Sequence, residues 1–319
     1  MRILITGGAG FIGSHLSERL LACGHELAII DDLNDFYAVS EKETNLQHIR
    51  SNGTFVFFRT SVHSLRSIIE AFNSFRPSAV IHLAARAGIQ PSITSPLLYE
   101  RVNVRGTLNI LEAVVKYKVT KLVFASSSSV YGNNVMPPFR EDATINSPLS
   151  PYAATKICGE HLCYVYSKLH GFQALCLRFF TVYGPRQRPD LAIRKFMERI
   201  DGGKAVTIFG DGTSARDYTY VSDIVDGIVS SLECNSSFDV FNLGNASPVS
   251  ITGLVAGIET VLGKRARILT SPDLPGDMKV TCANISKASN LLNYSPKVSF
   301  MRGLELQAEW LQSKKQIQA

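Results

Sequence analysis

Short apolar segments alternate with longer segments of helical periodicity through the first half of this chain. The apolar runs cover residues 2–6, 26–30, 55–58, 79–83 and 122–125. Between them, the spacing of apolar residues predicts helices over 11–23, 62–75 and 96–117. Continuous β-branched runs that alternate with helices are typical of a parallel sheet covered on both faces. We therefore predict an α/β fold built on a doubly wound parallel sheet.

The chain changes character after about residue 177. Gly, Pro and Asp become frequent and the apolar runs become shorter. We expect residues 1–177, joined by parts of 218–245, to form the first domain. Residues 178–319 are expected to form mainly a smaller, mixed α/β domain. Open parallel sheets bind ligands at the carboxyl ends of their strands, so the site is expected there, between the two domains.

The composition of the chain limits the kinds of molecule that the protein is expected to bind. The chain has 319 residues and a net charge of +6, and its basic residues are scattered, which favours an anionic small molecule over nucleic acid. No apolar run reaches the roughly 18 residues of a membrane span, and the N-terminus lacks the pattern of a signal peptide. The six cysteines form no Cys-x-x-Cys pair and have no histidine cluster beside them, so we expect reduced thiols, no metal site and a cytoplasmic protein.

The first candidate site is a glycine loop between the first predicted strand and helix. Gly7, Gly10 and Gly13 have the spacing of a turn that lets a pyrophosphate approach the backbone at a helix N-terminus. Asp31 ends the next strand, where a carboxylate binds a ribose diol and repels a 2′-phosphate, so NAD is favoured over NADP. The alternative is a tight turn without a ligand.

The second candidate site combines a tyrosine and a lysine. Tyr152 and Lys156 are four residues apart and therefore share one face of a helix. An ammonium close to a phenol is expected to lower the pKa of the phenol towards the working range of a general base. Four serines at 126–129 follow a predicted strand and place hydroxyls at the same sheet edge. The alternatives are a surface pair and a serine-rich turn.

Together these motifs resemble the extended short-chain dehydrogenase/reductase family, whose first domain is of the Rossmann type. The resemblance rests on the glycine loop, on segments 82–85, 126–132 and 178–185, on Asn103, and on Tyr152 with Lys156, and it runs almost end to end. The chain is most similar to the nucleotide-sugar 4-epimerases. Among these, segments 180–190 and 283–286 resemble UDP-glucuronate 4-epimerases, whereas UDP-glucose 4-epimerases usually have Asn in place of Thr181.

The resemblance implies an isomerase that keeps NAD bound and converts UDP-glucuronate to UDP-galacturonate through a 4-keto intermediate. It makes Tyr152 the base for the sugar 4-hydroxyl, lets Lys156 hold the nicotinamide ribose, and makes Ser127 a hydrogen-bond partner of the 4-oxygen. The implied cofactor contacts are Gly7, Gly10, Phe11, Ile12, Gly13, Asp31, Leu83, Ala84, Ala85, Asn103, Tyr152 and Lys156. The implied substrate contacts are Ser127, Ser128, Ser129, Thr181, Arg188, Phe209, Arg216 and Asp277.

The serine run also bears on the reaction. Related 4,6-dehydratases and UDP-glucuronate decarboxylases carry acidic residues at the positions of Ser128 or Ser129, so the resemblance disfavours both reactions. Hydroxyls there could bind a uronate carboxylate. Two departures from the family pattern are Ser61, which replaces an adenine-binding Asp, and Leu274, which replaces an arginine.

Two other functions remain open. One is UDP-glucose/UDP-galactose 4-epimerisation, which uses the same catalytic residues. The other is a non-catalytic NAD-binding sensor of the same fold, which the intact Ser127, Tyr152 and Lys156 argue against.

A homodimer is predicted from two helices. The segments 96–117 and 151–170 are apolar over more of their circumference than one buried face requires. Packing both against their copies would give a four-helix interface, which is also how the resembled family dimerises. The alternative is that the second domain covers these helices.

Overall fold

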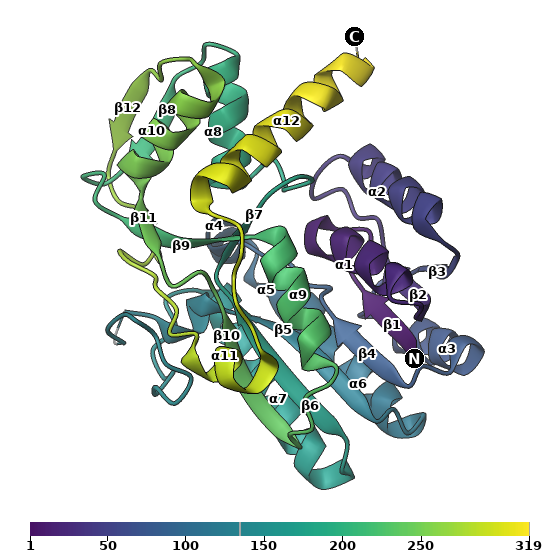
Figure 1. The fold of residues 1–319 in the computed structure, drawn as a ribbon. Coiled ribbons are helices and arrows are strands. Elements are labelled where there is room, and N and C mark those ends of the chain that lie inside the picture. The colour runs from purple at the N-terminus through teal and green to yellow at the C-terminus, as the bar shows by residue number, and fades with distance from the viewer. Residues whose placement is uncertain (134, 319) are drawn as a thin grey trace.

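The computed structural model describes residues 1–133 and 135–318. Its centre is a seven-stranded parallel sheet in the order β10-β6-β5-β4-β1-β2-β3 (Figure 1). The strands are β1 (Arg2–Thr6), β2 (Glu26–Asp31), β3 (Phe55–Arg59), β4 (Ala79–His82), β5 (Lys121–Ser127), β6 (Gln173–Phe179) and β10 (Phe238–Leu243). The order reverses beside β1, which is the switch point where ligands bind in such sheets. The predicted doubly wound parallel sheet is confirmed.

Helices cover both faces of this sheet, because successive side chains of its central strands point to opposite sides. Ile3 and Ile5 of β1 belong to the core that includes Leu16 of α1, whereas Leu4 belongs to the core with Phe72 and Ile110 on the other face. The helices around the sheet are α1 (Phe11–Ala22), α2 (Val39–Asn52), α3 (Leu65–Phe75), α6 (Gly106–Lys116), α7 (Pro151–His170) and α9 (Val221–Ser231). The sheet is thus buried on both faces, as its apolar strands require.

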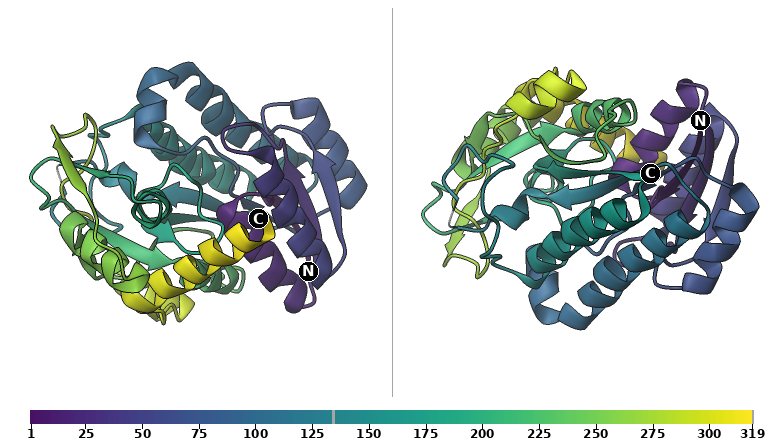
Figure 2. Two further views of the ribbon diagram at one scale, coloured as in Figure 1. Left: turned by 90° about the horizontal axis from the view of Figure 1, so that it is seen from above. Right: turned by 90° about the horizontal axis from the view of Figure 1, so that it is seen from below.

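The second part of the molecule contains two small sheets. One has the order β11-β9-β7, and the other pairs β12 with β8. Its elements are β7 (Thr181–Tyr183), α8 (Ala192–Asp201), β8 (Val206–Phe209), β9 (Ala215–Tyr220), β11 (Pro248–Ser250), α10 (Ile251–Leu262), β12 (Ile268–Ser271), α11 (Ser286–Leu292) and α12 (Phe300–Gln318). The end of α12 reaches back to α2, where Lys314 pairs with Glu41 (Figures 1 and 2).

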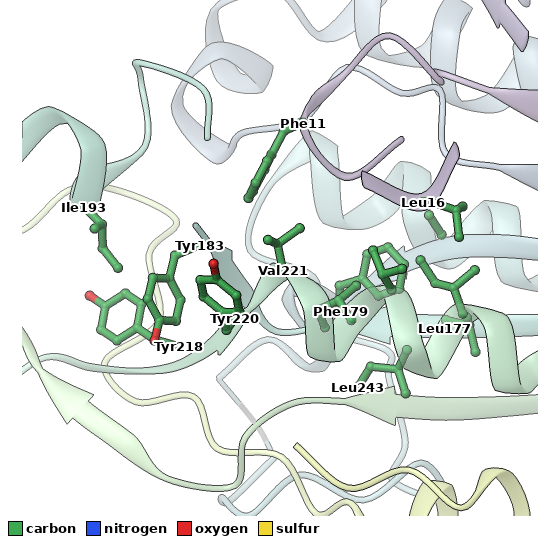
Figure 3. Packing of buried hydrophobic residues seen from close by; sticks show 14 of the residues in the cluster. Phe11, Leu16, Leu177, Phe179, Tyr183, Ile193, Tyr218, Tyr220, Val221 and Leu243 are labelled. Carbon is green, nitrogen blue, oxygen red and sulfur yellow. The ribbon is translucent and has the colours of Figure 1, made fainter. Parts of the chain in front are cut away.

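One apolar core continues from the large sheet into the second part. Tyr183, Tyr218 and Tyr220 lie between Ile193 of α8 and the group of Phe179, Val221 and Leu243 (Figure 3). The expected domain division stays a proposal. In the structure β6 runs to Phe179, and β10 from the later half of the chain joins the large sheet beside β6.

Some predicted boundaries differ from the structure. The helix expected over 62–75 begins at Leu65. The single helix expected over 96–117 is composite: α5 (Pro96–Tyr99), a π-helical segment (Glu100–Arg105) and α6, preceded by the short α4 (Ile89–Thr94). Apolar spacing cannot distinguish a π-helical turn from an α-helical one, because it changes the register by a single residue. In the described part of the chain, the helices are either too short or too polar to cross a membrane.

Candidate active site and cofactor cleft

A single large cleft opens at the carboxyl ends of the parallel strands and extends to the small sheets. Its volume is about 1230 Å³, above the roughly 300–1,000 Å³ usual for one small ligand. Residues of the glycine loop, the β2 and β4 ends, the serine run, β7, β8 and β9 all line it. The cleft therefore has room for two ligands, one against the large sheet and one against the second part.

The glycine loop forms a close-packed backbone cradle at one end of the cleft. Gly7 has φ +74°, and a Cβ there would lie 2.9 Å from the Ala84 nitrogen. A Cβ on Gly13 would lie 2.2 Å from the carbonyl oxygen of Gly7. Gly10 precedes the first turn of α1, so the free N–H groups of that turn are at the cleft. A cradle that any side chain would fill fits a pyrophosphate held by backbone N–H groups.

Asp31 is held in place beside this cradle. Its two carboxylate oxygens accept hydrogen bonds from Ala9 N at 3.1 Å and Leu33 N at 2.9 Å. Burial raises the pKa of the carboxyl, and these two backbone donors and the nearby Lys42 oppose that shift. Asp31 therefore lines the cleft in a fixed orientation, where its remaining lone pairs can accept from a ribose diol.

Most of the predicted cofactor contacts line the cleft, and one does not. Phe11, Ile12, Leu83, Ala84 and Ala85 are at its wall. Asn103 lies behind the wall, where its side chain bonds Arg86 N at 2.8 Å, Arg86 O at 3.0 Å and Thr155 Oγ1 at 3.0 Å. The structure thus gives Asn103 a supporting place: it holds the loop after β4 against the helix that carries Tyr152. The departure Ser61 also lines the cleft, and its hydroxyl bonds His63 Nδ1 at 2.7 Å.

Ser127, Tyr152 and Lys156 meet where β5 ends against α7. Ser127 Oγ accepts from Ser129 N at 3.2 Å and from Ser129 Oγ at 3.0 Å. A hydrogen bond with Ser127 favours the ionised form of Tyr152. Lys156 donates to the Ala125 carbonyl at 2.7 Å, and its ammonium is 6.0 Å from the centroid of the Tyr152 ring. Pro151 begins the helix and the Ser150 side chain caps it, which fixes the first turn that carries Tyr152.

The pKa of Tyr152 differs from the expectation based on its spacing from Lys156. Burial raises the pKa of Tyr152, and the opposing causes are the hydrogen bond with Ser127 and the positive charge of Arg188. Burial also lowers the pKa of Lys156 to about 8. The prediction that Lys156 lowers the pKa of the phenol is therefore wrong for this structure, because burial dominates and the cation that opposes it is Arg188. Helical spacing alone could not bring in residue 188, which comes from the loop after β7.

The predicted substrate contacts also line the cleft, on the side of the second part. They are Ser127, Ser128, Ser129, Thr181, Arg188, Phe209, Arg216 and Asp277. Arg188 pairs with Asp190 at 2.8 Å, and Arg216 pairs with Asp277 at 2.7 Å. Leu274 lines the cleft where the resembled family has an arginine.

Several cations in the cleft were missed by sequence reasoning. They are Lys42, Arg86, Lys195, Arg199 and Lys279. None of them belongs to a motif with a recognisable spacing. Together with Arg188 and Arg216, these cations make the cleft suitable for an anionic substrate, and the scattered positive charge of the sequence did not show where they would gather.

Comparison with known proteins identifies the class. Residues 3–244 match the NAD dependent epimerase/dehydratase family, and the chain belongs to that family. It is 42% identical over 308 residues to a UDP-glucuronate 4-epimerase of Thermodesulfobacterium geofontis, covering 96% of this chain and 95% of that protein.

Solved structures agree in fold and length. A UDP-glucuronic acid 4-epimerase of Bacillus cereus in complex with UDP-glucuronic acid and NAD has a TM-score of 0.92 at 38% identity, covering 98% of this chain and 100% of that one. A UDP-glucose 4-epimerase of Thermotoga maritima with UDP-glucose has a TM-score of 0.91 at 33% identity, covering 99% and 100%. Both relatives are similar along the whole chain, so fold similarity does not choose between their substrates.

The nucleotide released from the purified protein is expected to be NAD. Asp31 lines the cleft, and a carboxylate that binds the ribose diol of NAD would repel the 2′-phosphate of NADP. Denaturing the protein and separating the released nucleotides by chromatography measures this directly. Release of mainly NADP, or of neither nucleotide, would contradict the assignment of Asp31.

Proposed function

We propose that this protein is a UDP-glucuronate 4-epimerase that interconverts UDP-glucuronate and UDP-galacturonate. The observation that carries the proposal is the meeting of Tyr152, Ser127 and Lys156 in the cleft, beside a wall of uncharged hydroxyls at Ser128 and Ser129. The relatives support the substrate, because UDP-glucuronate 4-epimerases are among them.

The residues have separate tasks in this reaction. When bound, NAD would supply the acceptor and donor of the hydride at C4 of the sugar. Tyr152 accepts the proton of the 4-hydroxyl as C4 is oxidised and gives it back on reduction. Ser127 bonds the same oxygen, and Lys156 binds the ribose next to the nicotinamide. The glycine loop and Asp31 hold the other half of the dinucleotide.

The hydroxyls at the turn after β5 explain the choice of a uronate. Ser129 donates to Ser127, so it orients the hydroxyl that bonds Tyr152. Within the described residues, the hydroxyls of Ser128 and Thr181 have no hydrogen-bond partner, although both line the cleft. Two free donors can bind a carboxylate without adding charge that would promote its loss.

The substrate preference tests the proposal. We expect kcat/KM for UDP-glucuronate to exceed that for UDP-glucose by about ten- to a hundredfold, because a neutral hexose leaves buried donors without an acceptor at roughly 1–3 kcal/mol. Product separation after incubation with each UDP-sugar gives both values. Ser128→Ala should lower the ratio, while Thr44→Ala, on the exposed surface of α2, should leave it unchanged. Equal or reversed ratios favour UDP-glucose epimerisation, and UDP-pentose products would show decarboxylation.

We also propose a homodimer formed by α7 and the composite helix beside it. These elements contact one another, and the structure leaves apolar side chains on their outer faces: Leu97 is 82% exposed and Leu169 is 72% exposed. Val165 and Tyr164 of α7 are also exposed. The second part does not cover these side chains, and such a patch is unusual on a monomer. The cytoplasmic location stays a prediction.

Light scattering at micromolar concentration should give twice the chain mass of 35.0 kDa. The double change Leu97→Asp with Leu169→Asp should give the chain mass, since a charge in an apolar interface is costly. A comparable change on the far side, Leu269→Asp on exposed β12, serves as the control. A monomer mass for the unmodified protein would end this proposal.

A further inference from the structure

The polar contacts behind the catalytic helix converge on Glu160, a carboxylate that has no role in the reaction as derived above. Glu160 lies on α7 four residues after Lys156 and eight after Tyr152, so the three share one face of the helix. One carboxylate oxygen accepts from Ser126 Oγ at 2.5 Å and from Arg178 Nε at 2.9 Å, and the other accepts from Arg178 Nη2 at 2.7 Å. All three side chains are buried.

These contacts are part of an ordered docking of α7 on β5. A Cβ on Gly159 would lie 2.4 Å from the Phe124 ring, so the helix and the strand approach closely at this point. The next residue of β5, Ala125, accepts the hydrogen bond of Lys156, and Ser126 then bonds Glu160.

The residue that follows Ser126 on β5 is Ser127, the hydrogen-bond partner of Tyr152. The three docking contacts therefore lie directly behind the pair that binds the sugar 4-oxygen. They determine how far apart the end of the strand and the first turn of the helix are held.

Arg178 extends the same network to the turn that carries the other serines. It faces Ser126 across the β5–β6 ladder, and its guanidinium is 4.8 Å from the centroid of the Tyr131 ring. Tyr131 ends the 3₁₀ turn Ser128–Tyr131, and its hydroxyl donates to Asn242 Oδ1 on β10 at 2.7 Å. One buried ion pair thus connects the catalytic helix, three strands and the serine turn.

A contribution to folding stability alone does not explain the buried ion pair between Glu160 and Arg178. Replacing such a pair with apolar side chains of similar volume is often neutral or stabilising, because desolvation offsets the attraction of the charges. Hydrogen bonds to a carboxylate are directional, however, and fix a separation that apolar packing would leave looser. The charge also matters for Lys156, since Glu160 is one of the groups that raise the pKa of Lys156 against the effect of burial.

We propose that Glu160 is a positioning residue for the epimerisation. Through Ser126 and Arg178 it fixes the distance between the Ser127 hydroxyl and the Tyr152 phenol, and its carboxylate, one helical turn from Lys156, favours the charged form of that ammonium. The inference rests on the roles proposed above for Ser127, Tyr152 and Lys156.

Three substitutions separate the two parts of this role. Ser126→Ala removes one hydrogen bond to the carboxylate and should lower kcat about tenfold with little change in KM or in NAD content. Glu160→Asp keeps the negative charge but shortens the side chain by one methylene, which lengthens its hydrogen bonds to Ser126 and Arg178. We therefore expect kcat to fall and the pH profile of kcat to remain unchanged. Glu160→Gln removes the charge, and we expect kcat to fall by about a hundredfold.

The pH profile of kcat gives the readout that a purely structural role would not change. A negative charge favours the protonated ammonium, so its removal in Glu160→Gln lets Lys156 lose its proton at lower pH. The alkaline limb of the profile should therefore move to lower pH in Glu160→Gln and stay unchanged in Glu160→Asp. Glu70→Gln, which breaks an exposed ion pair with Arg66 on α3, is the control for a lost carboxylate.

Melting temperature and NAD content are measured for every variant. Wild-type kcat per folded molecule in Ser126→Ala and Glu160→Asp would overturn the positioning role, whether or not Glu160→Gln folds. An unchanged alkaline limb in a folded Glu160→Gln would overturn the electrostatic role. If the unmodified protein epimerises no UDP-sugar, the proposed function fails first and this inference fails with it.

Discussion

Replacing Tyr152 with Phe is expected to lower kcat on the true substrate by at least about a hundredfold, or roughly 2.7 kcal/mol of transition-state stabilisation. The substitution removes the oxygen that accepts the proton of the 4-hydroxyl and leaves the ring in place. The ring packs edge-on to Tyr99 with centroids 6.2 Å apart, so the local packing should survive. Ser127 and Lys156 keep their own hydrogen bonds in this variant.

The matched control is Tyr166→Phe on the same helix, whose hydroxyl bonds Glu112 away from the cleft. Both variants should retain NAD after purification, and only Tyr152→Phe should lose turnover in a steady-state assay. Near wild-type turnover of Tyr152→Phe would remove the tyrosine from the mechanism. Loss of NAD together with turnover would instead show that the hydroxyl contributes to cofactor binding.

The second large effect is expected for Gly13→Ala, which should weaken NAD binding by about a hundredfold. A Cβ at this position would lie 2.2 Å from the Gly7 carbonyl oxygen and 2.7 Å from the Cα of Gly8. Both are backbone atoms, so the loop must open to admit the methyl group. Overpacking of this kind costs about 1–3 kcal/mol, and the displaced atoms are those that cradle the pyrophosphate.

Gly202→Ala is the control, because Gly202 lies after α8 in an ordinary conformation and its added Cβ would be 3.2 Å from the nearest atom. NAD retained after gel filtration and the Kd from titration of the NAD-free protein measure the effect. Wild-type NAD content in Gly13→Ala would show that the loop can adjust and that its close packing is not needed for the cofactor.

Much of the fold could be predicted because its signals are local. The apolar runs at β1, β2, β4 and β5 are continuous, as strands buried on both faces must be, and these strands and the edge strand β3 were placed within a few residues. The strands β6 and β10 and the helix α2 were not predicted. In α2 the buried face is narrow and only Lys42, Asn45, Leu46 and Ile49 are buried, so an apolar pattern is nearly absent.

In the candidate site, too, the local arrangements could be predicted and the long-range ones could not. Tyr152 and Lys156 share a helix, and Gly7, Gly10 and Gly13 share one turn, so their relative placement follows from backbone geometry within a few residues. Asn103 was expected at the cofactor, yet the structure places it behind the wall, where it holds Arg86. A sequence does not distinguish an asparagine whose buried amide bonds the backbone of a loop from one whose amide contacts a ligand.

By itself the sequence determined the type of sheet, and it predicted the edge where the cleft lies and the candidate catalytic residues, because each depends on neighbours along the chain. Only the tertiary structure decided which distant groups surround them. Burial raises the pKa of Tyr152, and the hydrogen bond with Ser127 and the charge of Arg188, rather than Lys156, oppose that shift. Glu160 meets Ser126 and Arg178 only because α7 packs across β5 and β6. Electrostatic effects depend on distance and on exclusion of water, and neither is defined until separate segments of the chain pack together.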